Sequence, residues 1–134
     1  MGRERESNAM GRIRGEIVVG GKKRWTLFDS DARHSYIVAD AAPPADVKFL
    51  PAERVTALGG RTHKVRQVCL VFAEVEGHRL DFAANVLEEI ADDEDGRRIE
   101  VLFGALAMQA FGLKLDLKNE RLDWSHFSTE LVEL

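Results

Sequence analysis

An aspartate followed by a serine in a short polar turn is the feature of this sequence best placed to do chemistry. Asp29, Ser30, Asp31 and Ala32 stand between two apolar runs, residues 25–28 and 36–38. That arrangement predicts a strand, a sharp turn and a second strand. Backbone groups hold a carboxylate rigidly in such a turn, and catalytic carboxylates are commonly found there. Asp29 is therefore the leading candidate for a catalytic residue.

The other chemistry-bearing residues give weaker signals. The acidic run at residues 92–95 lacks the spacing of a calcium loop and predicts a solvated loop. Cys69 is the single cysteine, so it excludes an intramolecular disulfide and a zinc site built on cysteine. The four histidines show no metal-ligand spacing, so we expect neither a metal nor a cofactor; they are His34, His63, His78 and His126.

Composition narrows the function further. The 134 residues fit one domain, and 19 Lys+Arg against 23 Asp+Glu give a net charge of −4, which does not favour binding to nucleic acid. No apolar stretch approaches the roughly 20 residues of a membrane span, and no secretory signal precedes the domain. A cytoplasmic location is expected. Residues 1–14 are expected to be disordered or a tag remnant, with the domain in residues 15–134.

Short strands separated by turns dominate the rest of the chain. Gly59 and Gly60 separate two strand-like runs, residues 55–58 and 63–68, as the tip of a hairpin would. Residues 79–86 alternate apolar and polar. Residues 99–103 predict a strand, residues 105–111 a short helix that Gly112 ends, and residues 113–117 and 121–124 a strand pair. Many short strands and one helix predict a closed or nearly closed all-β domain.

Residues 28–37 resemble the active-site loop of the retropepsin-like (retroviral-type) aspartic proteases, in the form found in bacterial members. That loop has an apolar pair, then Asp, Thr or Ser, Gly, and Ala or Ser; here the glycine position is Asp31. Residues 101–106 resemble the family's late strand, glycine and helix, and Leu58-Gly59-Gly60 resembles its flap tip. The resemblance covers roughly residues 15–125. It implies an all-β, closed retropepsin-like (acid protease) β-barrel with one short C-terminal helix.

The resemblance also implies a mechanism. Two Asp29 carboxylates of a homodimer would share one proton and activate a water that hydrolyses a peptide bond. Ser30, Asp31 and Ala32 would support this dyad, with Ser30 bonding across the two-fold axis. Gly59 and Gly60 would form the flap over a polypeptide substrate. The family expectation places chain termini at the dimer interface, and residues 131–134 are apolar enough to contribute.

Asp31 leaves alternatives open. A second carboxylate ~5 Å from the dyad costs on the order of 3 kcal/mol at an effective dielectric near 20, but below about 1 kcal/mol if it points to solvent. The chain is then an active protease with an altered pH optimum, an enzyme with a narrow substrate range, or an inactive dimeric peptide-binding module. An unrelated small β-barrel with a coincidental acidic loop is a further alternative.

Overall fold

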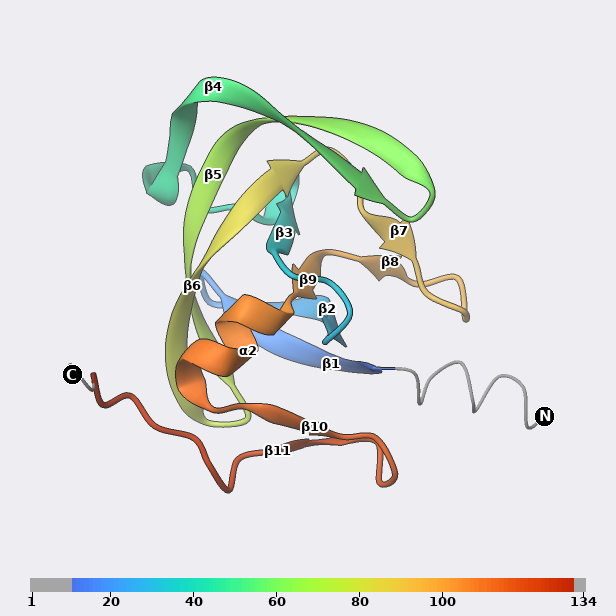
Figure 1. Ribbon diagram of the computed structural model, residues 1–134. Coiled ribbons are helices and arrows are strands. Elements are labelled where there is room, and N and C mark those ends of the chain that lie inside the picture. The colour runs from blue at the N-terminus through green and yellow to red at the C-terminus, as the bar shows by residue number, and fades with distance from the viewer. Residues whose placement is uncertain (1–10, 132–134) are drawn as a thin grey trace.

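The computed structural model describes residues 11–131 and shows a seven-stranded sheet that closes on itself (Figure 1). Pairing of Val18 with Glu74 and of Val19 with Ala73 joins the first strand in the sheet order to the sixth and closes the ring. The sheet order is β1 (Arg12–Val19), β2 (Lys22–Asp29), β9 (Val101–Phe103), β3 (Ser35–Val38), β6 (His78–Leu87), β5 (Arg61–Val75) and β4 (Val47–Leu58). The predicted all-β fold is confirmed.

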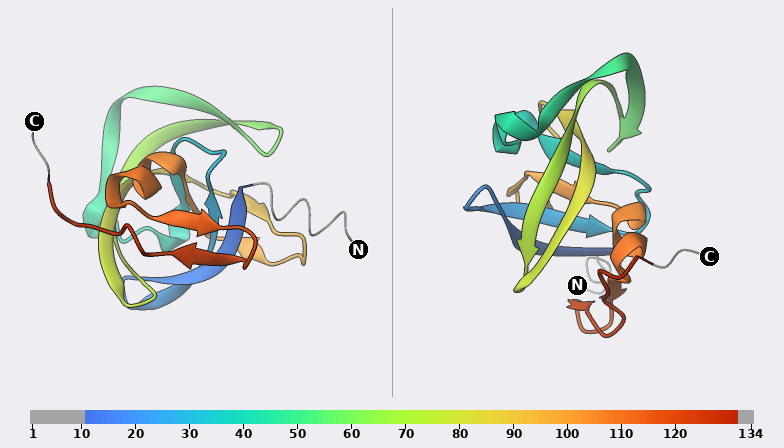
Figure 2. Two further views of the ribbon diagram at one scale, coloured as in Figure 1. Left: turned by 60° about the horizontal axis from the view of Figure 1, so that its bottom comes forward. Right: turned by 90° about the vertical axis from the view of Figure 1, so that its left-hand side faces the viewer.

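Smaller elements complete the domain. The 3-10 helices η1 (Ala39–Ala41) and η2 (Pro44–Asp46) connect β3 to β4. A small hairpin pairs β7 (Ala91–Asp92) with β8 (Arg98–Ile99), and a second one pairs β10 (Lys114–Asp116) with β11 (Arg121–Asp123). Helix α2 (Ala105–Phe111) and the β10–β11 hairpin lie at one end of the ring, opposite the β4–β5 hairpin (Figure 1 and Figure 2).

The core follows from the alternation of the strands. On β5, Cys69 and Val71 are buried, whereas Leu70 and Phe72, which alternate with them, are exposed. Burying each large apolar side chain contributes roughly 1.5–3 kcal/mol, so this alternation fixes which face of the strand turns inward. Three aromatic rings from three strands meet in the core, with centroids 5.3 Å apart for Phe28–Phe103 and 4.7 Å for Phe82–Phe103.

Helix α2 ends as the sequence predicts. Gly112 adopts φ 70°, a left-handed conformation that glycine takes without a side-chain penalty, and its N–H returns to the carbonyl of Gln109 at 3.3 Å. The next N–H, that of Leu113, donates to the carbonyl of Met108 at 2.9 Å. The predicted strand pair after the helix is confirmed as β10–β11.

Two boundaries differ from expectation. β1 begins at Arg12, ahead of the boundary expected at residue 15, because residues 12–14 pair with the end of β2. Residues 1–10, where a disordered segment or tag remnant is expected, lie outside the described residues. β4 extends back to Val47 although Pro51 interrupts it, because a register shift between Phe49 and Arg54 accommodates the proline. Across residues 11–131, no helix is both long enough and apolar enough to cross a bilayer.

Candidate active site

Asp29 is the last residue of β2, and its own side chain forms the turn that follows. Its Oδ1 accepts the N–H of Asp31 at 2.9 Å, and its carbonyl accepts the N–H of Ala32 at 3.2 Å. An aspartate that binds the backbone two residues ahead is typical of tight turns. The Asp29 side chain is therefore fixed by the backbone at the point where the strand stops, as the sequence predicts.

The surroundings of Asp29 shift its acidity. Burial raises the pKa of this half-buried carboxyl above the ordinary value of an aspartate, because a low dielectric disfavours the charged form. The N–H of Asp31 and the positive charge of Arg12 lower the pKa, the negative charge of Asp31 raises it, and the N–H of Ala32 lowers it. The net effect is a raised pKa, which suits a group that must exchange a proton.

The amino end of α2 holds the back of the turn. The N–H of Ala105 donates to the carbonyl of Ala32 at 2.7 Å, and the N–H of Leu106 donates to the carbonyl of Arg33 at 3.1 Å. Both donors belong to the first turn of the helix, where N–H groups have no partner within the helix itself. The helix and the active-site turn therefore satisfy each other's backbone groups.

Gly104 brings the helix close enough to make these bonds. A Cβ at this position would collide with the carbonyl of His34, so only glycine allows the approach. The N–H of Gly104 also donates to the buried hydroxyl of Ser35 at 2.9 Å. Since β9 lies between β2 and β3, the strand that leads into Gly104 is flanked by the strands on both sides of the turn.

Ser30 ties the turn to the start of β1. Its N–H donates to the carbonyl of Gly11 at 2.8 Å, and its hydroxyl donates to the same carbonyl at 3.2 Å. These bonds lie within one chain, and the bond across a two-fold axis remains a prediction.

Asp31 stands where the resemblance leads one to expect glycine, and its backbone is not strained. Its φ is not positive, since among residues 11–131 only Glu76 and Glu120 are non-glycine residues with positive φ. Its carboxylate lies against Gly11: a Cβ on Gly11 would stand 2.9 Å from Oδ2 of Asp31. The exposed side chain therefore lies beside Gly11, the residue before β1, and its charge raises the pKa of Asp29.

Asp29 and the tip of the β4–β5 hairpin face one pocket of about 280 Å³. The pocket has an apolar part and a charged part. Its apolar lining is Leu27, Leu58, Ile90, Ala91, Ile99 and Leu102, together with Gly59. Its charged lining is Arg12, Asp29, Asp92, Asp93 and Glu94. Of the residues predicted for the site, Asp29 and Gly59 line this pocket, and Ser30, Asp31 and Ala32 form the turn behind Asp29.

The β4–β5 hairpin, which is the predicted flap, ends in a tight turn. Gly59 and Gly60 have φ of 61° and 76°, the two successive positive values that a tight hairpin turn requires. Below the tip, the hydroxyls of Tyr36 on β3 and Thr56 on β4 lie 2.7 Å apart and form a hydrogen bond. This bond joins the flap to the strand that follows the active-site turn, so the flap has a defined position over the sheet.

A second hollow of about 360 Å³ lies under the flap strands. Its lining is His34, Tyr36, Arg54, Val55, Thr56, Val65 and Asn85. Arg54 Nη1 donates to Asn85 Oδ1 at 3.3 Å across this space. Among the described residues, no three or more His, Cys, Asp or Glu side chains come together in a way that could hold a metal ion.

Comparison with known proteins gives a structural match and no sequence match. No protein-family model matches the chain, and no curated protein matches it either. Among solved structures, the retroviral protease-like domain of Ddi1 from Leishmania major is similar, with a TM-score of 0.61 and 15% sequence identity. The alignment covers 84% of this chain and 86% of that chain. The fold is retropepsin-like.

Within this retropepsin-like fold, one part of the site was not predicted. The acidic run was expected to be a solvated loop, and this expectation is wrong for Asp93, whose side chain is only 2% exposed. Residues 91–99 form the β7–β8 hairpin beside the Asp29 pocket. The sequence held one signal, since two apolar residues, Ile90 and Ile99, flank the run and are both buried.

Proposed function

We propose that this protein is an aspartic endopeptidase that works as a homodimer, each chain contributing one Asp29. The observation that supports this best is the position of Asp29: a backbone-fixed carboxyl with a raised pKa that shares its pocket with the tip of a flap. The retropepsin-like fold supports the same proposal, because the similar solved structure is that of a retroviral protease-like domain.

The chemistry needs two carboxylates that share one proton. An ionised Asp29 takes a proton from a water, whose oxygen attacks the carbonyl carbon of the scissile peptide bond. The protonated Asp29 of the other chain donates to the carbonyl oxygen, which gives a tetrahedral intermediate. The C–N bond then breaks as the amine nitrogen receives a proton. Two carboxylates ~3 Å apart cannot both ionise, so their pKa values separate and acidic conditions are favoured.

A polypeptide would lie extended between the flap and the active-site turn. The flap strands and the strands below them offer backbone groups to an added strand, and closure of the flap would exclude water. The Tyr36–Thr56 hydrogen bond fixes the distance between the flap and β3, the strand that follows the active-site turn. No metal or cofactor is needed for this chemistry.

A second candidate function is a dimeric peptide-binding module without catalysis. The observation that favours it is Asp31, whose negative charge raises the pKa of Asp29 and would enter the dyad region twice in a dimer. At neutral pH this repulsion would leave the dyad with a proton it could not release. The two functions share one fold and differ in whether the pair of Asp29 carboxyls can catalyse peptide hydrolysis.

The test is hydrolysis of a mixed peptide library between pH 3 and 8. The proposal predicts cleavage with a bell-shaped pH dependence, lost in Asp29→Asn. In Asp31→Gly the basic limb should move to lower pH, because a like charge is removed. If the wild type does not cleave peptides and Asp31→Gly does, the fold supports catalysis and Asp31 prevents it. If neither protein cleaves but both bind peptides, the peptide-binding module is favoured.

A further inference from the structure

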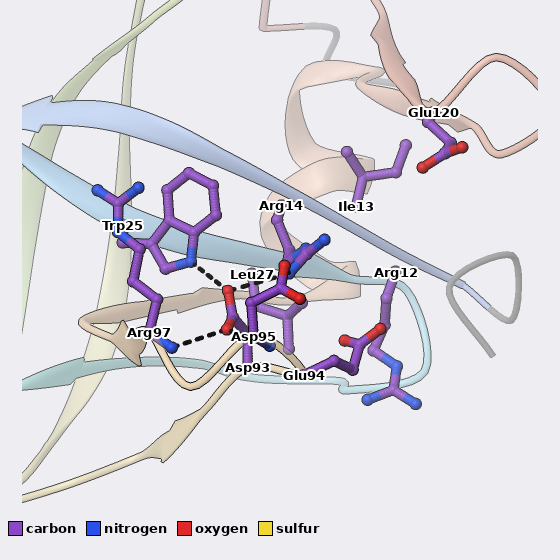
Figure 3. Close-up of a pocket in the computed structure, with 10 residues that line it drawn as sticks. All are labelled: Arg12, Ile13, Arg14, Trp25, Leu27, Asp93, Glu94, Asp95, Arg97 and Glu120. Atoms are coloured by element: carbon purple, nitrogen blue, oxygen red, sulfur yellow. Dashed lines mark hydrogen bonds and ion pairs between the residues drawn. The ribbon is translucent and has the colours of Figure 1, made fainter. Parts of the chain in front are cut away.

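The β7–β8 hairpin forms one wall of the Asp29 pocket. The hairpin and the residue before it supply Ile90, Asp92 and Ile99 to the pocket lining, and the flap tip supplies Leu58 and Gly59. The same hairpin also lines a further hollow, of about 350 Å³, through Asp93, Glu94, Asp95 and Arg97 (Figure 3). The hairpin therefore lines two hollows, one of which holds the candidate catalytic residue Asp29.

Asp93 anchors this wall to the sheet. Its Oδ2 accepts the indole N–H of Trp25 at 2.8 Å and Nη1 of Arg14 at 3.1 Å, which come from β2 and β1 (Figure 3). Its Oδ1 accepts the N–H groups of Asp95 and Arg97, each at 2.9 Å. A buried carboxylate that receives four hydrogen bonds from three segments fixes those segments relative to one another.

Arg97 adds two further contacts between the hairpin and the sheet. Its guanidinium carbon lies 3.9 Å from the centre of the Trp25 ring, and its Nη2 is 3.3 Å from Glu16 Oε2 on β1. The indole is thus held by a carboxylate at its N–H and by a cation on its face. The hairpin is clamped onto β1 and β2 at two points.

The wall combines an apolar surface with a carboxylate that has no partner. The charge of Asp93 is paired with that of Arg14, whereas the side chain of Asp92 makes no hydrogen bond or ion pair within residues 11–131. Next to it the pocket is lined by aliphatic side chains, those of Ile90, Ile99 and Leu102 among them. Lysine and arginine have the matching shape, since an aliphatic stem packs on apolar surface while the charged head reaches a carboxylate.

We propose that the β7–β8 hairpin recognises a lysine or arginine side chain of the polypeptide bound at Asp29. Asp92 supplies the counter-charge, and Asp93 is the positioning residue that holds the hairpin in place. This inference rests on the function proposed for the Asp29 pocket and adds a substrate class to it. The flap tip and the hairpin both line the space that this side chain would occupy.

Binding to the full chain carrying Asp29→Asn tests the inference without cleavage. Fluorescein-labelled extended peptides, each with one lysine at a different position, are compared by anisotropy with the same peptides carrying norleucine there. At one position lysine should bind about fivefold more tightly than norleucine, the upper range for a partly exposed ion pair. Adding Asp92→Asn should abolish the preference, and Asp92→Lys should reverse it.

The matched control is Asp81→Asn, the same loss of charge at an exposed site on the outside of β6. It should leave the preference intact. Adding Asp93→Asn should remove the preference for lysine while norleucine peptides bind as before, whereas a merely structural defect would weaken both. Equal binding of lysine and norleucine at every position, no binding of any lysine peptide, or an equal effect of Asp81→Asn and Asp92→Asn would overturn the inference.

Hydrolysis separates this inference from the proposed function. If the wild type cleaves peptides but kcat/KM is the same for lysine and norleucine, the protease stands and the hairpin does not select basic side chains. If nothing is cleaved but lysine peptides bind preferentially, the selectivity stands and the catalytic proposal fails.

Discussion

Replacing Asp93 with asparagine tests how the acidic hairpin is held. Burial alone raises the pKa of this carboxyl, but the hydrogen bonds from Trp25, from the N–H groups of Arg97 and Asp95 and from Arg14 outweigh burial and lower the pKa to about 2. Asparagine has one oxygen for the two backbone donors. Its NH2 would then face the indole N–H of Trp25 and the guanidinium of Arg14, so donor meets donor.

The magnitude follows from the pKa. A fall to about 2 corresponds to about 2.5 kcal/mol of folding free energy at neutral pH, since each tenfold change in proton affinity is worth about 1.4 kcal/mol. Unpaired donors add to this, so we expect Asp93→Asn to cost about 3 kcal/mol at pH 7. Because the folded-state pKa is depressed, the stabilisation is present above the ordinary aspartate pKa and is lost as the pH falls toward 2.

Urea unfolding at pH 7, with thermal melts from pH 7 down to pH 3, measures both effects. The difference in stability between wild type and Asp93→Asn should shrink steadily below about pH 4. The matched control is Asp95→Asn, because Asp95 binds the same Arg14 but is 76% exposed; it should cost less than about 1 kcal/mol. A loss below about 1 kcal/mol for Asp93→Asn, or one equally large at pH 3 and pH 7, refutes the reasoning.

Three further predictions concern the active-site turn. Gly104→Ala should lower the free energy of unfolding by at least about 2 kcal/mol in urea, because its Cβ meets the carbonyl of His34, whereas Gly15→Ala, with 3.6 Å to its nearest neighbour, should be nearly neutral. Ser35→Ala should cost about 1–3 kcal/mol in the same assay, because it leaves the buried N–H of Gly104 without its acceptor, and an unchanged midpoint would contradict that role. Asp29→Asn should stabilise the fold in thermal melts as the pH rises above the ordinary aspartate pKa and have no effect at pH 3, because a raised folded-state pKa penalises the ionised form; stabilisation that does not change with pH would contradict this.

Local signals in the sequence predicted most of the scaffold. The alternation in residues 79–86 predicted β6, the two glycines predicted the tip of the β4–β5 hairpin, and Gly112 predicted the end of the helix. The polar turn between two apolar runs predicted Asp29 as the candidate catalytic residue, because an aspartate in such a turn has few roles besides turn formation and chemistry. These features depend on residues close together in the chain.

What the sequence did not reveal depends on contacts between distant residues. Asp93 is buried because Arg14 and Trp25, 79 and 68 residues away, bring donors to it. Nothing in a run of acidic residues distinguishes the one that is buried from its solvated neighbours. In the same way, the carboxylate of Asp31 lies beside Gly11, a residue 20 positions earlier in the chain that packs against the turn.

Activity in mixtures of wild type and Asp29→Asn tests the central claim most directly, namely that two chains share one catalytic dyad. The mixtures are prepared by joint unfolding and refolding at constant total protein, and peptide hydrolysis is measured at the optimum pH. If each active site needs one Asp29 from each chain, activity follows the square of the wild-type fraction and falls to about a quarter in an equal mixture. A linear fall to about half means that each chain works alone, and no hydrolysis by the wild type at any pH between 3 and 8 contradicts the protease itself.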